Sequence, residues 1–268
     1  MALFGFIGAG NMGYPLLKAA VNTFGSEEVV YTDASPERSQ YVMKDTGIQF
    51  SEDNIAVVKQ CKYLVLAVKP QFFPQVLSQI QKVVTPEQVV ISIAAGITIE
   101  KIKDAISDST RIVRAMPNTP AMVLKGMTGI CFSKDKFSEE EKKVVDRFFT
   151  SFGKYEVFEE QMMNAVICAN GSSPAYVYMF IEALADSVVA YGIPRDKAYT
   201  LVAQTVLGAA AMVLETGEHP GKLKDNVCSP GGTTIAAVKA LEEYGLRNAV
   251  MKATDACYEK AVSLSNKK

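Results

Sequence analysis

The sequence predicts an α/β protein that begins with a doubly wound parallel sheet and continues as an all-helical region. Up to about Phe158, short apolar runs alternate with helical patterns, which is typical of a parallel sheet covered by helices on both faces. Beyond that point the strand-like runs end and long helical patterns follow one another. We therefore expect one domain over residues 1–159 and a second over residues 160–268.

Strands are expected wherever short runs of apolar residues suggest burial. The run Ala2–Ile7 is followed by a glycine turn and by a helix that begins near Asn11. The run Val29–Tyr31 precedes a helix whose start is marked by a capping residue, Ser35, and by Pro36 at its first position. Four further strands are expected over Tyr63–Val68, Val89–Ile93, Ile112–Met116 and Thr128–Phe132.

Three long helices are expected in the second domain, over Tyr176–Tyr191, Arg195–Glu215 and Thr233–Leu264. Within the second of these, Ala198–Leu214 is apolar around most of its circumference, and such a helix needs burial on all sides. Residues 160–268 alone can hardly surround it. We therefore expect an intertwined homodimer in which two subunits share this core.

The composition excludes several classes of protein. The 268 residues include 28 basic and 29 acidic side chains, so nothing favours binding to nucleic acid or to an anionic membrane. Five scattered cysteines without a CxxC pair argue against a disulfide framework or a zinc site. The one histidine, His219, lies in a turn and leaves little room for imidazole-dependent catalysis. With no apparent membrane span or secretory signal, we expect a cytoplasmic protein without a metal.

The first turn fits the pattern GxGxxG, in which glycines allow a tight turn, close approach to a pyrophosphate and close packing of helix on strand. A bare GxGxxG arises readily from glycine usage, but this one follows a buried strand and opens a helix. Asp33, twenty residues after the last glycine, ends the second strand, where a carboxylate can bind ribose hydroxyls; a solvated turn residue is the alternative. The pattern predicts a Rossmann-type dinucleotide site formed by Gly8, Ala9, Gly10, Asn11, Met12 and Gly13.

The choice of dinucleotide stays open between NADPH and NADH. The Asp33 carboxylate would repel a 2′-phosphate and so favours NADH. Ser35 and Arg38, however, lie close enough in sequence to accommodate NADPH. Asp33 inclines the expectation slightly toward NADH.

Three more segments follow strands and would lie at the carboxyl edge of the sheet, where open α/β sheets bind ligands. Their small residues and prolines would form a floor for the nicotinamide. Each segment could instead be ordinary loop sequence, and the lysine a solvated surface residue. The residues concerned are Ala67, Val68, Lys69 and Pro70, then Ala95 and Gly96, then Pro117 and Asn118.

The segment Ser229–Thr234 (SPGGTT) leads into a long helix. Its small side chains leave unpaired N–H groups and the positive end of the helix dipole facing one small volume. A carboxylate or phosphate can bind there, and we expect that anion to be the substrate because the cofactor is held elsewhere. The alternative is an ordinary cap made by Ser229 or Thr233.

Together these segments resemble pyrroline-5-carboxylate reductases over essentially the whole chain. The matching segments are FIGAGNM (Phe6–Met12), AVKPQ (Ala67–Gln71), Ala94–Gly96, RAMPNTP (Arg114–Pro120), GSSPAY (Gly171–Tyr176) and LKDNVCSPGGTTI (Leu223–Ile235). The last of these is highly specific to that family. The resemblance implies that NADPH or NADH reduces the C=N bond of L-1-pyrroline-5-carboxylate to give L-proline. It also implies a Rossmann domain and an interlocking helical domain, with homodimers that often assemble into decamers.

The resemblance further implies roles for single residues. The substrate carboxylate would rest on the backbone of Gly231, Gly232, Thr233 and Thr234, with Ser229 beside it. Thr234 would hydrogen-bond the ring nitrogen and is our candidate catalytic residue. Asn54 and Asn226 match positions that contact the cofactor, and Glu160 matches one that can approach the substrate. The stretch Asn170–Ser173 departs from the commoner SGSG form at two places, where we expect altered packing.

Two other functions fit parts of the pattern. A β-hydroxyacid dehydrogenase or another cyclic imine reductase would share the layout. Such dehydrogenases, however, carry a catalytic lysine on the first long helix of the second domain, and Met162–Tyr191 contains no lysine. A nucleotide-sensing or scaffold protein would be expected to have a degraded substrate loop, whereas Ser229–Thr234 is intact.

Overall fold

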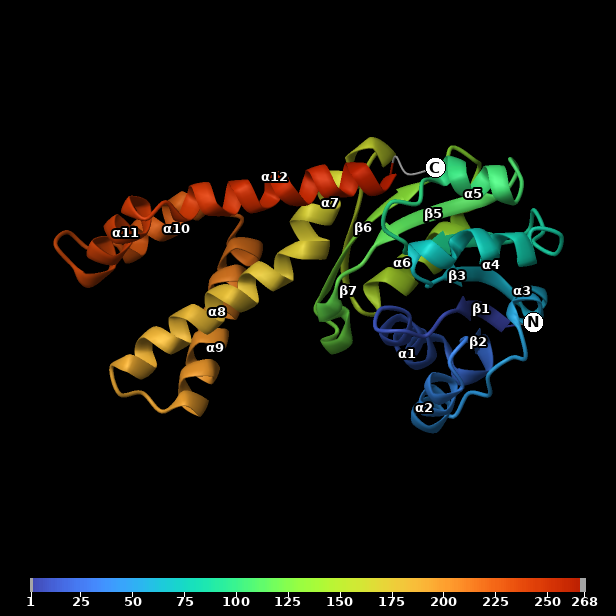
Figure 1. Cartoon of the computed structure of the whole chain (residues 1–268), viewed down its shortest axis with the longest axis horizontal. Coiled ribbons are helices and arrows are strands. Elements are labelled where there is room, and N and C mark those ends of the chain that lie inside the picture. Colours follow the sequence, from blue (N-terminus) through green and yellow to red (C-terminus); the bar gives the residue numbers. More distant parts are fainter. Residues whose placement is uncertain (1, 266–268) are drawn as a thin grey trace. The chain divides into compact units, whose positions relative to one another are not determined.

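A computed structural model describes residues 2–265, which form two compact units (Figure 1). Among these residues, unit 1 consists of residues 2–172 and 257–265, and unit 2 of Ser173–Ala256. This division differs from the expected domains at both ends of the helical region. Residues 160–172 stay with the sheet because Met163 and Val166 are buried in its core, and the last helix belongs to unit 1 from Cys257 on.

Unit 1 is built on a seven-stranded sheet of order β2-β1-β3-β4-β5-β6-β7. All neighbouring strands pair in parallel except β5 and β6, which run antiparallel, so the expected parallel sheet is confirmed with one reversal. The seventh strand was not predicted. The strands are β1 (Ala2–Ile7), β2 (Val29–Thr32), β3 (Cys61–Leu66), β4 (Val89–Ser92), β5 (Arg111–Met116), β6 (Gly126–Phe132) and β7 (Gly153–Val157).

Helices cover both faces of this sheet, as Figure 1 shows. One face carries α1 (Gly13–Phe24), α2 (Pro36–Thr46) and α6 (Glu139–Thr150), and its core includes Phe4 and Phe148. The other face carries α3 (Asn54–Gln60), α4 (Phe73–Ile80), α5 (Ile99–Ala105) and α7 (Met163–Val166). Alternate residues of each strand point to opposite faces, so both faces receive apolar side chains.

Short helical turns and caps complete unit 1. Ser35 caps α2 by accepting a hydrogen bond from Arg38 N, as the sequence predicted. Ser138 and Glu141 form a reciprocal capping box that starts α6. The turns are η1 (Ser26–Glu28), η2 (Pro70–Phe72), η3 (Thr119–Val123), η4 (Glu160–Met162) and the π-helix η5 (Ile167–Ser172).

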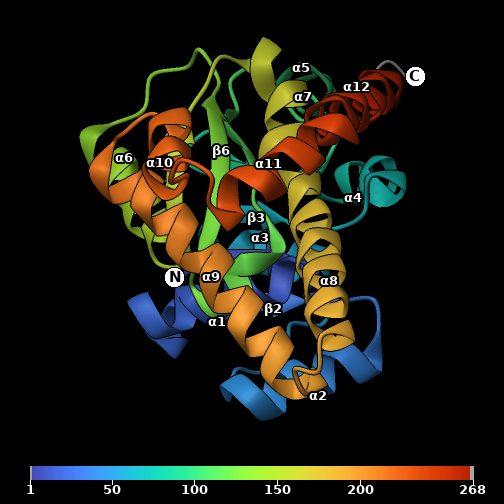
Figure 2. The same ribbon diagram turned by 90° about the vertical axis from the view of Figure 1, so that its left-hand side faces the viewer.

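Unit 2 is all helix, and α8 (Ser173–Ala190) and α9 (Arg195–Thr216) lie side by side in it (Figure 2). Three buried residues, Ala185, Ala198 and Val202, join this pair. The prediction of one long helix over Thr233–Leu264 was wrong. The segment forms two helices, α11 (Thr233–Glu243) and α12 (Leu246–Ser265). The break lies at Gly245, whose φ of 73° is a left-handed conformation that glycine adopts without strain.

The apolar helix α9 is largely uncovered within a single chain. Among the described residues, only this helix is long and apolar enough to cross a membrane by length and composition alone. Only 11% of that apolar window is buried, so most of its apolar surface is exposed in the described part of the chain. Its exposed apolar side chains include Leu201, Leu207, Met212 and Leu214.

Candidate functional site

Most of the expected cofactor residues of unit 1 lie at the carboxyl ends of β1, β3 and β4, while Asp33 follows β2 and Pro117 and Asn118 follow β5. Ala67 N donates to Ile7 O at 2.9 Å, and Ile93 N donates to Leu66 O at 3.2 Å, so the three strand ends lie next to one another. In the strand order β2-β1-β3-β4-β5, the connection reverses direction between β1 and β3. Open α/β sheets bind ligands in the crevice at this reversal, which is where the glycine turn lies.

Each glycine of the turn has a different physical reason to be glycine. Gly8 has a φ of +94°, and a Cβ on it would lie 2.7 Å from Ala67 O. A Cβ on Gly13 would lie 2.4 Å from Gly8 O, so this residue lets α1 pack directly on the turn. At Gly10, in contrast, a Cβ would meet nothing within 4 Å. The first and third glycines therefore serve the fold, and the second leaves open space for a ligand to approach the backbone.

The start of α1 suits an anion. Its N-cap residue, Met12, makes no side-chain cap, and its first turn contains no acidic residue. The N–H groups of that turn and the positive end of the helix dipole thus face the open space beside Gly10. A pyrophosphate fits this arrangement.

Asp33 and Arg38 both hydrogen-bond the backbone of Ala9 in the turn. Asp33 Oδ2 accepts a hydrogen bond from Ala9 N at 2.7 Å, and Oδ1 accepts one from Ser35 N at 2.9 Å. Arg38 Nε donates to Ala9 O at 2.5 Å, and its guanidinium lies 4.7 Å from the Tyr14 ring centroid. Asp33, which favours NADH, and Arg38, which could accommodate NADPH, therefore contact the same turn.

The other strand-end residues are also in unit 1. Lys69 is exposed, and Gly96 has a φ of +76° with a Cβ position 3.2 Å from the backbone of Leu264. Asn118 is buried, its Nδ2 donates to Asn170 O, and its Oδ1 accepts from Met127 N at 2.9 Å. The Asn118 side chain therefore serves the fold, and the backbone is what it can offer to a cofactor.

Asn54 begins α3 after its cap, Asp53, and donates from Nδ2 to Gln79 Oε1 at 2.6 Å. This side chain is half-buried, so part of it stays accessible. Its predicted contact with the cofactor stays a prediction.

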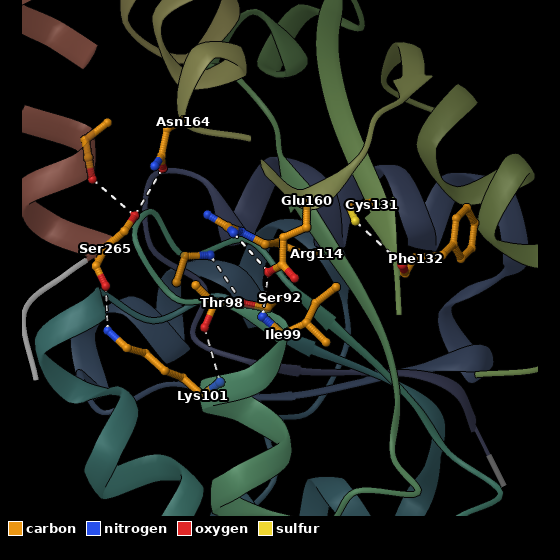
Figure 3. Close-up of polar contacts among 12 residues, drawn as sticks. Ser92, Thr98, Ile99, Lys101, Arg114, Cys131, Phe132, Glu160, Asn164 and Ser265 are labelled. Carbon is orange, nitrogen blue, oxygen red and sulfur yellow. Dashed lines mark hydrogen bonds and ion pairs between the residues drawn. The ribbon is translucent and has the colours of Figure 1, made fainter. Parts of the chain in front are cut away.

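Glu160 is half-buried and forms an ion pair with the buried Arg114, which Figure 3 shows. Its Oε1 lies 3.1 Å from Arg114 Nη1 and accepts a hydrogen bond from Ile99 N, the first residue of α5, at 2.8 Å. The Arg114 side chain is 3% exposed, so Glu160 compensates a charge that is almost fully removed from water. Burial, and after it the Glu160 charge, raise the pKa of the Cys131 thiol. Glu160 thus has a structural role that its sequence match did not suggest.

Arg114 is the partner of Glu160, a pairing that the sequence did not directly indicate. It interrupts the apolar run of β5, and a charge inside a buried strand indicates a buried ion pair. Its Nε and Nη2 atoms are buried and have no hydrogen-bond partner within residues 2–265. The Glu160 carboxylate is therefore the main compensation of this guanidinium in the described part of the chain.

The last turn of α12 contacts the same region of unit 1 (Figure 3). Lys101 Nζ donates to Ser265 O at 2.8 Å, and Ser265 Oγ donates to Asn164 Oδ1 at 3.1 Å. These contacts, together with the approach of Leu264 to Gly96, fix the loop between β4 and α5.

A groove of about 870 Å³ has Glu160 in its lining. It is lined by residues of α5, β6 and the segment Val157–Gln161, and includes both acidic and basic side chains. The glycine turn and the other strand-end residues are not part of it. We place the site at the strand ends because that is where the backbone geometry suits a dinucleotide.

The expected substrate loop lies in unit 2. It begins after α10 (Pro220–Val227), where Asn226 is exposed, and ends at the start of α11. Gly231 has a φ of +70°, and the N-cap residue of α11, Gly232, makes no side-chain cap. The alternative of a helix capped by Ser229 or Thr233 is therefore not what the structure shows. Thr234 is half-buried in the first turn, which is free to bind an anion.

The one histidine has a structural position. His219 is the N-cap of α10, and its Nδ1 accepts a hydrogen bond from Gly221 N at 3.0 Å. This capping position agrees with the expected structural turn residue.

Two family models match separate parts of the chain. One, described as pyrroline-5-carboxylate reductase dimerisation, matches residues 160–264. The other, described as NADP oxidoreductase, coenzyme F420-dependent, matches residues 3–96. The first contains the uncovered helix α9, and the second contains the glycine turn.

Similar proteins match over nearly the whole chain. A curated pyrroline-5-carboxylate reductase of Escherichia coli (strain K12) is 45% identical over 264 residues, covering 97% of each chain. The solved pyrroline carboxylate reductase of Plasmodium falciparum, with NADP bound, has a TM-score of 0.89 and 32% identity, and covers 99% of this chain and 98% of that one. The enzyme of Coxiella burnetii has a TM-score of 0.90 and 31% identity, and covers 99% of both.

Proposed function

We propose that this chain, which belongs to the pyrroline-5-carboxylate reductase family, binds NAD(P)H at the Gly8–Gly13 turn and its substrate at the Ser229–Thr234 loop. It is an NAD(P)H-dependent reductase of the C=N bond of L-1-pyrroline-5-carboxylate and forms L-proline. The observation that carries this conclusion is 45% identity to a curated reductase along 97% of both chains. Family membership also removes the hydroxyacid dehydrogenase and scaffold alternatives.

The residues of the turn fit the dinucleotide. The open side of Gly10 admits the pyrophosphate, and the uncapped first turn of α1 supplies N–H donors. Asp33 is proposed to accept hydrogen bonds from the adenosine ribose. When bound, the dinucleotide supplies the hydride. The proposed floor below the nicotinamide is made by the strand-end residues Ala67, Val68, Lys69, Pro70, Ala95, Gly96, Pro117 and Asn118, with Asn54 and Asn226 as further contacts.

We infer a preference for NADH over NADPH. The support is the Asp33 carboxylate, which two backbone N–H groups hold in place so that it cannot turn away from a 2′-phosphate. Arg38 lies at the same turn, and its positive charge allows NADPH to bind as well.

The substrate is proposed to bind through its carboxylate. The backbone of Gly231 and Thr233 offers N–H donors at the positive end of the α11 helix dipole. Gly232 N already donates to Ser229 O at 3.0 Å, which shapes the loop around these donors. Ser229 adds a hydroxyl beside them. Glu160 is proposed to act near the substrate through the loop it anchors at Ile99.

The reaction requires little acid–base catalysis from the side chains. A cyclic imine is already electrophilic when protonated, so the protein mainly has to align it and exclude other orientations. The Thr234 hydroxyl is proposed to orient the ring nitrogen and to relay a proton through water. No imidazole is needed, in agreement with the structural position of His219.

The chain forms a homo-oligomer through its dimerisation region. We propose a homodimer in which the partner subunit covers the exposed apolar side of α9, and assembly of five dimers into a decamer. Size-exclusion chromatography with light scattering tests this, since it distinguishes masses of one, two and ten chains. We also propose a cytoplasmic location, which suits five cysteines that are all free thiols.

The activity is tested by the absorbance of the reduced nicotinamide. The purified protein is mixed with L-1-pyrroline-5-carboxylate and either NADH or NADPH, and the loss of absorbance is followed. We expect oxidation of both, with a larger kcat/KM for NADH. Oxidation of neither cofactor would contradict the proposed function, and a larger kcat/KM for NADPH would contradict only the cofactor preference.

A further inference from the structure

Two cysteines lie where the chain leaves unit 1 and where it returns. Cys168 is in the π-helix η5, whose last residue, Ser172, is the last of unit 1 before unit 2 begins. Cys257, on α12, is the first residue after unit 2 ends. Both are free thiols, and the whole of unit 2 lies between them in the chain.

The contacts of the two thiols place them against the same face of one helical segment. Cys257 Sγ donates a hydrogen bond to Ser172 Oγ at 3.2 Å. Cys168 Sγ donates to Asn164 O at 3.4 Å. Asn164, Cys168 and Ser172 are spaced four residues apart, so they share one face of the α7–η5 segment. The Cys257 thiol thus lies over the face that carries Cys168.

The environment of Cys168 agrees with this proximity. Burial, and after it a hydrogen bond with the Cys257 side chain, raise the pKa of Cys168 to about 11. Cys168 is buried, whereas Cys257 is half-buried. The two sulfur atoms are therefore within reach of each other, and one of them is accessible to a small solute.

We propose that Cys168 and Cys257 are a redox-sensitive pair that closes to a disulfide when a peroxide oxidises the protein. The more accessible Cys257 reacts first, because its thiolate attacks one peroxide oxygen, the O–O bond breaks, and the second oxygen leaves as water after taking up a proton. The Cys257 sulfenic acid is then attacked by the Cys168 sulfur. The S–O bond breaks, the S–S bond forms, and the oxygen leaves as a second water with the Cys168 proton. Two thiols thus lose two electrons and two protons, and one peroxide becomes two waters.

The other three cysteines lack these conditions. Cys61 and Cys131 are buried like Cys168, but their thiols donate to Val58 O and Phe132 O, and no more accessible cysteine contacts them among the described residues. Cys228 is half-buried but belongs to unit 2, next to the substrate loop. The pairing is therefore specific to the two ends of unit 2.

The disulfide has two physical consequences. It closes a ring that contains the whole of unit 2, which restricts the unfolded chain and raises Tm. The raised pKa of Cys168 makes its thiolate scarce at neutral pH. The second step is therefore slow at pH 7, and its rate rises about tenfold for each unit by which the pH is raised toward the pKa of Cys168.

The test uses the full-length protein treated with hydrogen peroxide at pH 8, blocked with an alkylating reagent and analysed by mass spectrometry. We expect a loss of two hydrogens, alkylation of three thiols in place of five, and a linked peptide pair containing Cys168 and Cys257. Dithiothreitol reverses the change. Tm should rise by roughly 5 °C on oxidation.

Matched variants complete the test. Cys228→Ser should still lose two hydrogens, whereas Cys257→Ser should not, and Cys168→Ser should gain oxygen at Cys257 without forming a link. The proposal is overturned if the wild-type protein gains oxygen or stays unchanged. It is also overturned if the linked peptides contain Cys228, or if Cys257→Ser still loses two hydrogens.

Discussion

The Asp33 carboxylate accepts a hydrogen bond from the backbone of Ala9, with 2.7 Å between Oδ2 and the amide nitrogen. This bond joins the end of β2 to the second residue of the glycine turn. Because Ser35 N holds the other oxygen at 2.9 Å, the negative charge stays at the proposed ribose site whichever cofactor binds. Cofactor choice should therefore respond directly to this charge.

Replacing Asp33 by asparagine should raise the affinity for NADPH about tenfold relative to NADH, because the repulsion of the 2′-phosphate is removed. Asparagine keeps an acceptor for Ala9 N, so the turn itself should persist. Fluorescence titration with each reduced cofactor measures both affinities. The control is Glu140→Gln on the exposed surface of α6, which should leave their ratio unchanged. An unaltered ratio in Asp33→Asn would show that this charge does not select the cofactor.

Gly10 and Gly13 should differ sharply when each is replaced by alanine. At Gly10 the new Cβ meets nothing within 4 Å, so stability should be kept while the affinity for both cofactors falls at least tenfold. At Gly13 the Cβ would lie 2.4 Å from Gly8 O, so Tm itself should fall. Thermal unfolding and cofactor titration separate the two effects. Full cofactor affinity in Gly10→Ala would mean that the pyrophosphate does not approach this backbone.

Thr234→Ala should lower kcat by at least tenfold. A positioned proton-transfer group typically contributes a factor of ~10²–10⁴ to the rate. Thr234→Ser keeps the hydroxyl and is the matched control, so it should retain most of the activity. Steady-state kinetics with pyrroline-5-carboxylate measures both variants. If Thr234→Ala is as active as Thr234→Ser, the hydroxyl has no part in the reaction.

Glu160→Ala should lower the free energy of unfolding by about 3 kcal/mol, because it leaves the buried Arg114 guanidinium without its counter-charge. Glu159→Ala, at the exposed neighbouring residue, should change it little. Urea unfolding followed by circular dichroism compares the two variants. If Glu160→Ala is as stable as Glu159→Ala, the ion pair with Arg114 contributes no net stability.

The sequence was informative wherever local pattern and topology agree. Six strands of the sheet follow from apolar runs, and the placing of the strand-end loops follows from parallel pairing, which brings all carboxyl ends to one edge. The strand β7 was missed because it lies at the sheet edge, where Lys154 and Glu156 are exposed and break the apolar pattern. The break at Gly245 was missed because apolar residues continue at helical spacing on both sides of it.

The contacts of Glu160 could not be read in the same way. Its partner Arg114 is 46 residues away in the chain, and only the folded sheet brings the two together. The charge in the apolar run of β5 was a signal that some acidic partner exists, but nothing local identifies it. The same holds for Cys168 and Cys257, whose contact depends on the return of α12 to unit 1.

The central claim is that this chain moves a hydride from a bound nicotinamide to the C=N carbon of L-1-pyrroline-5-carboxylate. The most direct measurement supplies NADH that carries deuterium at both C4 positions and examines the proline by mass spectrometry and NMR. The account predicts one deuterium per L-proline, located on the ring carbon beside nitrogen that belonged to the C=N bond. Proline without deuterium, or deuterium at another carbon, would contradict it.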